Sequence, residues 1–150
     1  MLTQLNAMED FQRDLSYHVV RAENDQIKLT ARLTDRFHDI RITVLVDFGT
    51  LEIRTAAVEF VRHPSKDCPA VAARMERLIG FVVGRGLNRK LQETFGGGEG
   101  CGNLRVMLLG LLPLALNVKA AAGFTDEQQM LDSISERLTG SCAGYIRRPA

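Results

Sequence analysis

The chain has no strong excess of either charge and no long apolar run. It carries 19 lysines and arginines against 18 aspartates and glutamates, which gives a net charge of +1. Such a balance provides no general attraction to polyanions, so nucleic acid is not expected as a partner. The most apolar stretch, Val106–Leu116, contains Gly110 and Pro113 and is much shorter than the roughly 20 residues of a membrane span. We therefore expect a buried core helix there and no membrane partner.

Cysteine is also scarce, with three residues in 150. An odd, small number of cysteines does not indicate a disulfide framework, and reduced thiols in a cytoplasmic protein are the simpler interpretation. Residues 1–14 show no basic start followed by an apolar segment, so we expect no signal peptide. The predicted localisation is cytoplasmic.

The composition is that of an ordinary globular protein, with 45% hydrophobic and 25% charged residues. A length of 150 residues fits one domain with a substantial core. No repeat or Pro/Ser-rich linker divides the chain. We predict a single domain over residues 1–150, in which residues 1–12 form an N-terminal arm that is either disordered or helical.

The first half of the chain shows the two-residue period of β-strands. Apolar and polar residues alternate over 27–34 and 40–47, a turn follows at 47–50, and a further strand is expected over 51–61. A weaker first strand is expected over 15–21. The alternation slips near Ala56 and Ala57, which predicts a β-bulge.

The period changes after His63-Pro64 to that of helices. Apolar residues from Val71 to Val83 have helical spacing, with Pro69 at the start and Gly86 as a C-terminal cap. Further helices are expected over 88–95, over 103–121, and from a capping-box-like start at 125–128 to Gly140. The predicted fold is α+β: an antiparallel meander of about four strands (residues ~14–62), then about four helices packed on one face of the sheet.

Cys68 is the most informative thiol because Pro69 places it at the start of a helix. Unpaired amides and the positive end of the helix dipole favour a thiolate at such a position. Arg62, His63 and Lys66 precede it in the sequence and add positive charge. The alternative is a small, buried, apolar cysteine with no chemical role.

Cys101 lies in a similar place, between a glycine-rich loop and an expected helix. Glycines let backbone amides approach an anion or a metal-bound ligand, so Gly97, Gly98, Gly100 and Asn103 are candidate cofactor-binding residues. The loop lacks the Lys-Ser/Thr ending of a phosphate-binding P-loop. The alternative is a tight turn between two helices. Cys142, near the C-terminus, is given no role.

The expected hairpin extends the candidate site to the end of the sheet. With the hairpin centred on Gly49, His38 would lie opposite Phe60 and close to His63. His38, His63 and Asp39 could then reach the sheet edge near Cys68. Thiolates, a carboxylate and imidazoles suit Zn²⁺ or iron. The candidate metal ligands are therefore Asp39, Cys68, Cys101, His38 and His63.

The chain resembles a bacterial family known only as a domain of unknown function. The resemblance covers roughly residues 36–112, and its most specific part surrounds Cys101. That family usually reads Gly-Cys-Thr-His-Leu there, whereas this chain reads Gly100-Cys101-Gly102-Asn103-Leu104. Other shared features are His38-Asp39-Ile40, Pro64 followed by Cys68, Leu78-Ile79-Gly80 and Gly86.

More distantly, the layout resembles the U-type scaffolds of iron–sulfur cluster assembly. Asp39, Cys68 and Cys101 match three ligand positions of those scaffolds. The remaining cysteine of the scaffolds would fall on Phe37, and their Leu-Pro-Pro-Val-Lys motif is missing. The resemblance implies a relative that binds Zn²⁺, iron or an iron–sulfur cluster, or one that has lost the metal.

Three interpretations remain open. The first is a non-catalytic metal- or cluster-binding protein that uses Cys68 and Cys101. The second is a structural or interaction module with packed thiols, which would bind a protein partner or form a homo-oligomer. The third is a thiol enzyme with Cys68 as nucleophile and His38 or His63 as base. The residues favour a protein that is not an enzyme.

Overall fold

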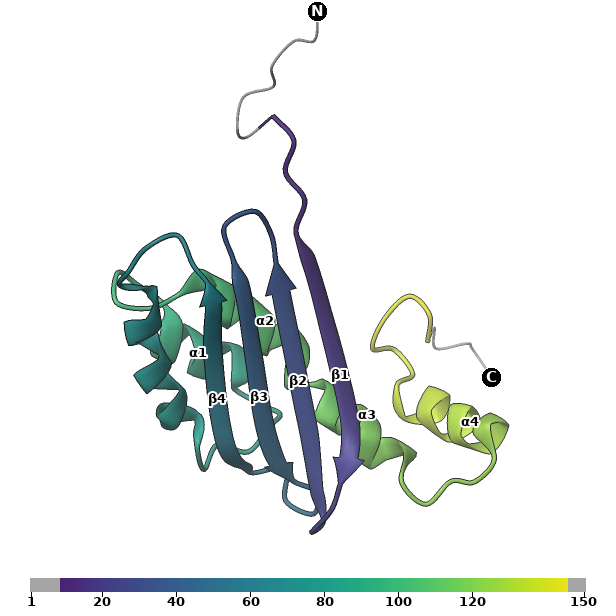
Figure 1. The fold of residues 1–150 in the computed structure, drawn as a ribbon. Coiled ribbons are helices and arrows are strands. Elements are labelled where there is room, and N and C mark those ends of the chain that lie inside the picture. Colours follow the sequence, from purple (N-terminus) through teal and green to yellow (C-terminus); the bar gives the residue numbers. More distant parts are fainter. Residues whose placement is uncertain (1–8, 146–150) are drawn as a thin grey trace, which may run out of the picture.

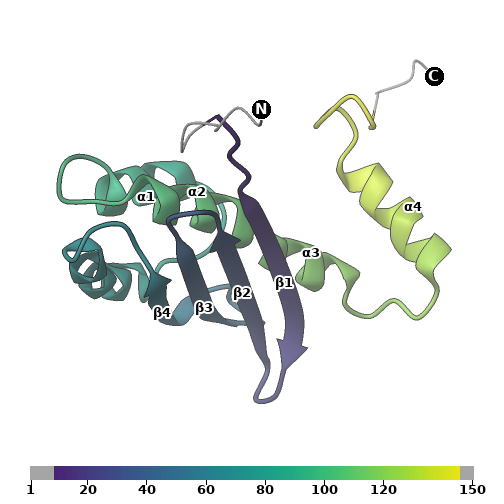
Figure 2. The ribbon, with the colours of Figure 1, turned by 45° about the horizontal axis from the view of Figure 1, so that its top comes forward.

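Four antiparallel strands form one sheet with the simple order β1-β2-β3-β4 (Figures 1 and 2). The computed structural model describes residues 9–145, so most of the N-terminal arm predicted over 1–12 lies outside the described residues. The strands are β1 (Asp14–Ala22), β2 (Gln26–Thr34), β3 (Asp39–Asp47) and β4 (Ile53–Arg62). The α+β class, with an antiparallel half followed by helices, is confirmed.

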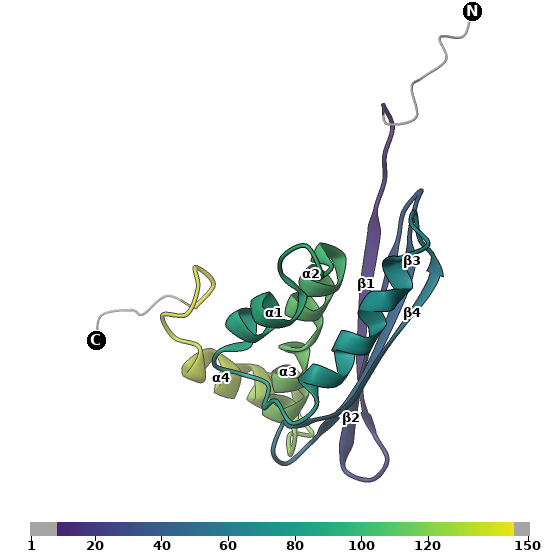
Figure 3. The same ribbon diagram turned by 90° about the vertical axis from the view of Figure 1, so that its left-hand side faces the viewer.

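The two faces of the sheet differ because the side chains alternate. On β2 and β3 one face carries only apolar side chains, all almost fully buried: Ile27, Leu29, Ala31, Leu33, Ile40, Ile42, Val44 and Val46. The helices pack against this face and leave the opposite face open (Figure 3). Period-two patterning therefore fixes which side of the sheet receives the helices.

The pairing of β3 with β4 differs from the predicted register. Ile40, rather than His38, lies opposite Phe60. The irregularities fall where Arg54 and Val61 are extra residues on β4, so the predicted bulge exists but not at Ala56–Ala57. The extra residue Arg54 changes the phase of the strand, so that Ala56, Val58 and Phe60 face the core as Ile53 does.

Among residues 9–145, five helical segments follow the sheet. They are the 3₁₀ helix η1 (Cys68–Leu78) and the α-helices α1 (Leu87–Phe95), α2 (Gly102–Leu111), α3 (Leu114–Ala121) and α4 (Glu127–Arg137). Within the described part of the chain, α4 contributes no buried residue and lies apart from the sheet (Figure 2).

The helix expected to run to Gly86 is shorter than predicted. It ends at Leu78, because the next residues pair with the start of β4 instead. The amide of Ile53 donates to the carbonyl of Phe81 (2.8 Å), and the amide of Gly80 donates to the carbonyl of Ile53 (2.9 Å). Gly80 has a φ of +91°, which glycine adopts without strain. Gly86 begins α1 instead of ending the preceding helix.

The apolar segment 102–121 forms two helices that are separated near Pro113. Its 20 residues and hydropathy of 1.6 would suffice in length and composition for a membrane span. However, six residues of the segment are completely buried in the core: Leu104, Met107, Leu108, Leu111, Leu112 and Ala115. The sequence predicted one core helix here; the structure has two, and α2 supplies most of the buried side chains.

Helix α2 approaches the sheet closely at Gly110. A Cβ added there would lie 2.2 Å from the Tyr17 hydroxyl oxygen and 2.6 Å from its Cζ. The Tyr17 ring on β1 thus occupies the space of the missing side chain. This contact fixes the position of α2, and with it the position of Cys101 at its start.

Candidate functional site

Cys68 and Cys101 line the same pocket although they come from different helices. Cys68 is the first residue of η1, and Cys101 is the N-cap of α2 with an extended backbone. Both are partly buried and unpaired. The pocket has a volume of about 360 Å³ and is called the thiol pocket below; its lining residues are Asp67, Cys68, Ala70, Val71, Arg74, Gly98, Glu99, Gly100 and Cys101.

Arg74 holds the two walls of the thiol pocket together. Its guanidinium donates to the carbonyl of Thr94 (3.0 Å) and forms an ion pair with Glu99 (2.9 Å). η1 is thereby joined to the end of α1 and to the glycine-rich loop. The pocket depends on tertiary contacts between these segments. The sequence predicted each segment but not how they pack together.

Backbone geometry explains part of the glycine-rich loop. A Cβ on Gly100 would lie 1.9 Å from the carbonyl oxygen of Phe95, and Gly97 has a φ of +76°. Gly98 has open space around it and an ordinary φ, so no steric reason requires glycine there. Gly98 and Gly100 line the thiol pocket. The cofactor-binding role of Gly97, Gly98 and Gly100 stays a prediction, and tight turning accounts for Gly97 and Gly100 without it.

A second polar centre lies at the turn between β2 and β3, around Asp35. The side chain of Asp35 is completely buried. It accepts hydrogen bonds from the amides of Phe37 and His38 (both 2.8 Å), from Nδ1 of His38 (2.9 Å) and from Nε of Arg13 (2.8 Å). Burial alone would raise the pKa of Asp35, but these donors together lower it to about 2. Asp35 is therefore an ionised carboxylate.

His38 is connected through Asp35 and Asn103 to the start of α2. Nε2 of His38 lies 3.3 Å from Nδ2 of Asn103, and Arg13 donates to Oδ1 of Asn103 (3.1 Å). Since the Asn103 oxygen accepts from Arg13, its NH₂ group faces His38 and must donate to Nε2. His38 then carries its proton on Nδ1, where Asp35 accepts it. The four side chains form a closed ring, called the Asp35 ring below.

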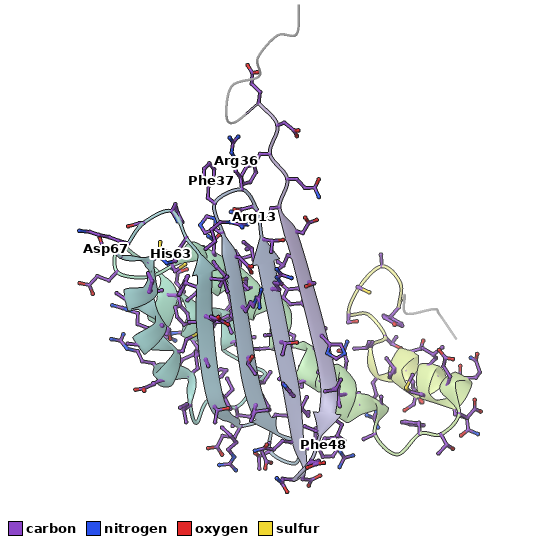
Figure 4. The ribbon with its side chains drawn as sticks, in the orientation of Figure 1. Arg13, Arg36, Phe37, Phe48, His63 and Asp67 are labelled. Carbon is purple, nitrogen blue, oxygen red and sulfur yellow. The ribbon has the colours of Figure 1, made fainter. Side chains whose placement is uncertain are left out.

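Sequence reasoning missed Asp35 and Arg13. The signal for Asp35 was its place at the start of the turn Asp35-Arg36-Phe37, where an aspartate accepts hydrogen bonds from the next amides. Arg13 carries no such local signal, because its partners lie 22 and 90 residues away. Figure 4 shows Arg13, Arg36 and Phe37 together at this end of the sheet, and His63 and Asp67 on the loop before η1.

Asp39 lies on the open face of the sheet. It accepts from Arg32 (3.2 and 3.1 Å) and from Arg41 (3.4 and 3.3 Å). The hydrogen bonds from Arg32, and then those from Arg41, lower the pKa of Asp39 despite its burial. Arg41 shares its face by the two-residue period, and Arg32 is directly opposite Arg41 on β2. Asp39 thus points away from the helices that carry the two thiols.

His63 lies on the loop between β4 and η1. Its Nδ1 donates to the carbonyl of Ser65 (2.6 Å), and its ring meets the ring of Phe60 edge to face at 6.2 Å. These contacts hold the loop that leads to Cys68.

The structure brings together only part of the predicted ligand set. Over residues 9–145, no three His, Cys, Asp or Glu side chains form a group that could hold a metal ion. Cys68 and Cys101 both line the thiol pocket, whereas Asp39 bonds to Arg32 and Arg41 and His63 to Ser65. Phe37, at the position of the scaffolds' remaining cysteine, stacks on Phe11 with ring centres 6.1 Å apart. These residues do not fit the ligand set of an iron–sulfur scaffold.

Comparison with known proteins identifies the family but not an activity. Residues 11–116 match the model of a family described as protein of unknown function (DUF2889). The match covers well over half of the 150 residues, so the chain belongs to this family, and the expectation of such a family is confirmed. No curated protein and no solved structure matches the chain. The matched segment contains the thiol pocket and the Asp35 ring, while α4 lies outside it.

Proposed function

We propose that this protein is a non-catalytic metal-binding protein whose site is the thiol pocket, with Cys68 and Cys101 as ligands. The observation that carries the proposal is that two cysteines, each at the start of a helix, line one pocket and stay partly accessible. Cysteines without a chemical role are more often buried one at a time in the apolar core. A shared, accessible pocket is the arrangement that two thiolate ligands require.

The chemistry of the pocket favours Zn²⁺ or Fe²⁺. Thiolates are soft ligands that bind these ions, and four-coordinate Zn²⁺ sites combine cysteine with histidine or carboxylate. Asp67 and Glu99 also line the pocket, but Glu99 is paired with Arg74 and neither forms a three-ligand group with the thiols among the described residues. A site with two fixed thiolates is open, and its other positions go to water, a further side chain or a partner protein.

The two alternative functions have less support. A thiol enzyme needs a base within reach of its nucleophile. His38 is held in the Asp35 ring and His63 is bonded to Ser65, and neither is among the lining residues of the thiol pocket. An interaction module with packed thiols gains support from Cys101, which packs partly against the core. That function predicts two thiols that take up no metal.

Metal analysis of anaerobically purified protein tests the proposal. After reconstitution with Zn²⁺ or Fe²⁺ and removal of excess ion, the wild type is expected to retain about one equivalent. Cys68→Ser and Cys101→Ser should each lose it, because two thiolates share one ion. Cys142→Ser is the matched control, since Cys142 is exposed, and it should bind as the wild type does. No bound metal in the wild type, or full retention in Cys68→Ser and Cys101→Ser, would refute the proposal.

A further inference from the structure

A second pocket lies between α3 and α4, the last two helices of the described chain. Its volume is about 520 Å³, which is within the range of roughly 300–1,000 Å³ that is usual for small-molecule sites. It is called the α3–α4 pocket below. Of its lining residues, only Leu116 falls within the segment that matches the family, residues 11–116. The pocket is therefore a feature of this chain that the family match does not cover.

The walls of the α3–α4 pocket are mostly apolar, and much of this surface remains in contact with solvent. α4 has 11 residues, and none of them is buried. Leu131 and Leu138, which face the pocket from α4, are 46% and 38% exposed, and Leu116 on α3 is 41% exposed. Ala120 and Ala121 line the pocket from α3 and take up little of the space between the helices. A ligand that fills this space would bury apolar surface, which is favourable.

Three polar side chains line the same pocket and can donate hydrogen bonds. They are Arg137 in the last turn of α4, Asn117 on α3, and Tyr145. Within residues 9–145, the guanidinium, the amide and the hydroxyl of these side chains have no hydrogen bond or ion pair in the protein. No aspartate or glutamate is among the described lining residues, so the charge of Arg137 is not balanced there. An anionic group is the chemical complement of such a wall.

We propose that the α3–α4 pocket binds a fatty acid, with the alkyl chain against the apolar walls and the carboxylate on Arg137. The apolar walls select an alkyl chain, and the unpaired guanidinium selects an anionic end, to which it can donate two parallel hydrogen bonds. The site is separate from the thiol pocket, since no residue lines both. The proposal thus goes beyond metal binding and does not depend on it.

Binding also gives α4 the tertiary contact that it lacks. Isolated helices shorter than about 12–15 residues are marginally stable in water, and α4 has 11 residues and no buried side chain. An alkyl chain between α3 and α4 would cover the apolar residues of α4 that line the pocket, which are Met130, Leu131, Ile134 and Leu138. We therefore expect the ligand to stabilise α4.

The first test titrates the full-length wild type with dodecanoate, below the concentration at which it forms micelles, by isothermal titration calorimetry. One dodecanoate per chain is expected to bind. Decanoate, which is two methylenes shorter, should bind about 10-fold more weakly. Dodecyltrimethylammonium has an alkyl chain of the same length and the opposite charge, and it should also bind about 10-fold more weakly or not at all. No binding of dodecanoate, or equal affinities for the anion and the cation, would overturn the proposal.

The second test uses variants on the two sides of the pocket. Arg137→Gln should weaken dodecanoate binding by about 10-fold. Arg89→Gln is the matched control, because Arg89 is exposed on α1 and pairs with Glu93, and it should bind as the wild type does. Ala120→Phe fills the pocket but keeps its donors, so it should abolish binding. Full affinity in a folded Ala120→Phe or Arg137→Gln protein, as judged by circular dichroism, would overturn the proposal.

Hydrogen exchange gives a readout that does not depend on any variant. The amides of Glu127–Arg137 should exchange about 10-fold more slowly with dodecanoate bound, while those of α1 should not change. An α4 that is already protected without ligand, in a protein that sediments as a dimer, would mean that a second copy fills the pocket and would overturn the proposal.

The thiol variants keep the two sites apart. Cys68→Ser should bind dodecanoate as the wild type does, because Cys68 does not line the α3–α4 pocket. Dodecanoate binding by a wild type that holds no metal would refute the metal site and support the fatty-acid site. Loss of dodecanoate binding in Cys68→Ser with intact circular dichroism would overturn the proposal of a separate site.

Discussion

Arg13 and Asp35 form an ion pair in which both Nε and Nη2 of the arginine lie 2.8 Å from Oδ2 of the aspartate. The two side chains differ in exposure, at 42% for Arg13 and 0% for Asp35. The contact joins the segment before β1 to the turn between β2 and β3. With the larger contributions of the hydrogen bonds from His38 and from the Phe37 amide, it lowers the pKa of this buried carboxylate, which links the stability of the fold to pH.

Stability should fall at low pH because the pKa of Asp35 is lower in the folded protein. Its usual value of 3.8 falls to about 2, so the carboxylate stabilises the fold fully above about pH 4 and loses this effect as the pH falls towards 2. The loss is on the order of 2 kcal/mol. Urea denaturation at a series of pH values measures it.

Asp39 and Asp47 also have lowered pKa values, so the wild-type curve contains their contributions. The difference between the wild type and Asp35→Asn isolates Asp35, and it should shrink between pH 4 and 2. Asp25→Asn is a matched control, because its exposed pair with Arg21 contributes below roughly 1 kcal/mol. A difference between wild type and Asp35→Asn that does not change with pH would contradict the assignment.

Gly110→Ala should lower the free energy of unfolding when residue 17 is tyrosine and raise it when residue 17 is alanine. Alanine favours a helix over glycine by about 1 kcal/mol, but its Cβ would meet the Tyr17 ring, and overpacking costs about 1–3 kcal/mol. We expect Gly110→Ala to destabilise the wild type and to stabilise a Tyr17→Ala background. Free energies of unfolding for the four proteins of this cycle give the comparison.

The same substitution at Gly102 serves as the control, since nothing lies within 4 Å of a Cβ there. Gly102→Ala should act alike in both backgrounds. Additive effects of Gly110→Ala and Tyr17→Ala would mean that the close approach of α2 to β1 is absent.

Gly100 and Gly98 form a matched pair on the wall of the thiol pocket. Gly100→Ala should destabilise the fold by roughly 2 kcal/mol, because its Cβ would collide with the Phe95 backbone, which cannot rotate away. Gly98→Ala should stay within about 0.5 kcal/mol of the wild type. Gly100→Ala should lower both the thermal unfolding temperature and the affinity for Zn²⁺. Equal stabilities of Gly100→Ala and Gly98→Ala would contradict the close approach of Gly100 to the Phe95 backbone.

Asp39 should prove to be structural rather than a metal ligand. Asp39→Asn keeps the shape but weakens the hydrogen bonds from Arg32 and Arg41, so it should cost about 1 kcal/mol of stability. Zn²⁺ affinity should remain that of the wild type, because Asp39 lies on the open face. A large loss of affinity in a folded Asp39→Asn protein would return Asp39 to the ligand set.

The sheet was predictable because its signal is local. Alternation along β2 and β3 identifies the strands and their buried faces, and the apolar run around Met107 and Leu108 identifies a core helix. The prediction that the helix continues beyond Leu78 was wrong. The apolar residues that follow lie in an extended segment, in which Val82 forms a β-bridge with Glu52. Helical and strand-like uses of a short apolar stretch cannot be told apart by periodicity alone.

The candidate site was predictable only in part. Helix starts at Cys68 and Cys101 followed from Pro69 and the glycines, but their meeting depends on the packing of η1 against the α1–α2 loop through Arg74. The expected register would have brought His38 near Phe60, whereas the actual turn and the extra residue Arg54 on β4 place Ile40 there. Asp39 faces the open side of the sheet because the next residue, Ile40, faces the core, and its role as a metal ligand stays a prediction.

X-ray absorption at the zinc edge of the Zn²⁺-loaded protein tests the central claim most directly. Two sulfur neighbours at about 2.3 Å are expected, from Cys68 and Cys101. Cys68→Ser should leave one sulfur neighbour or abolish binding, while Cys142→Ser should leave the spectrum unchanged. A zinc ion surrounded only by oxygen and nitrogen in the wild type would contradict a thiolate site.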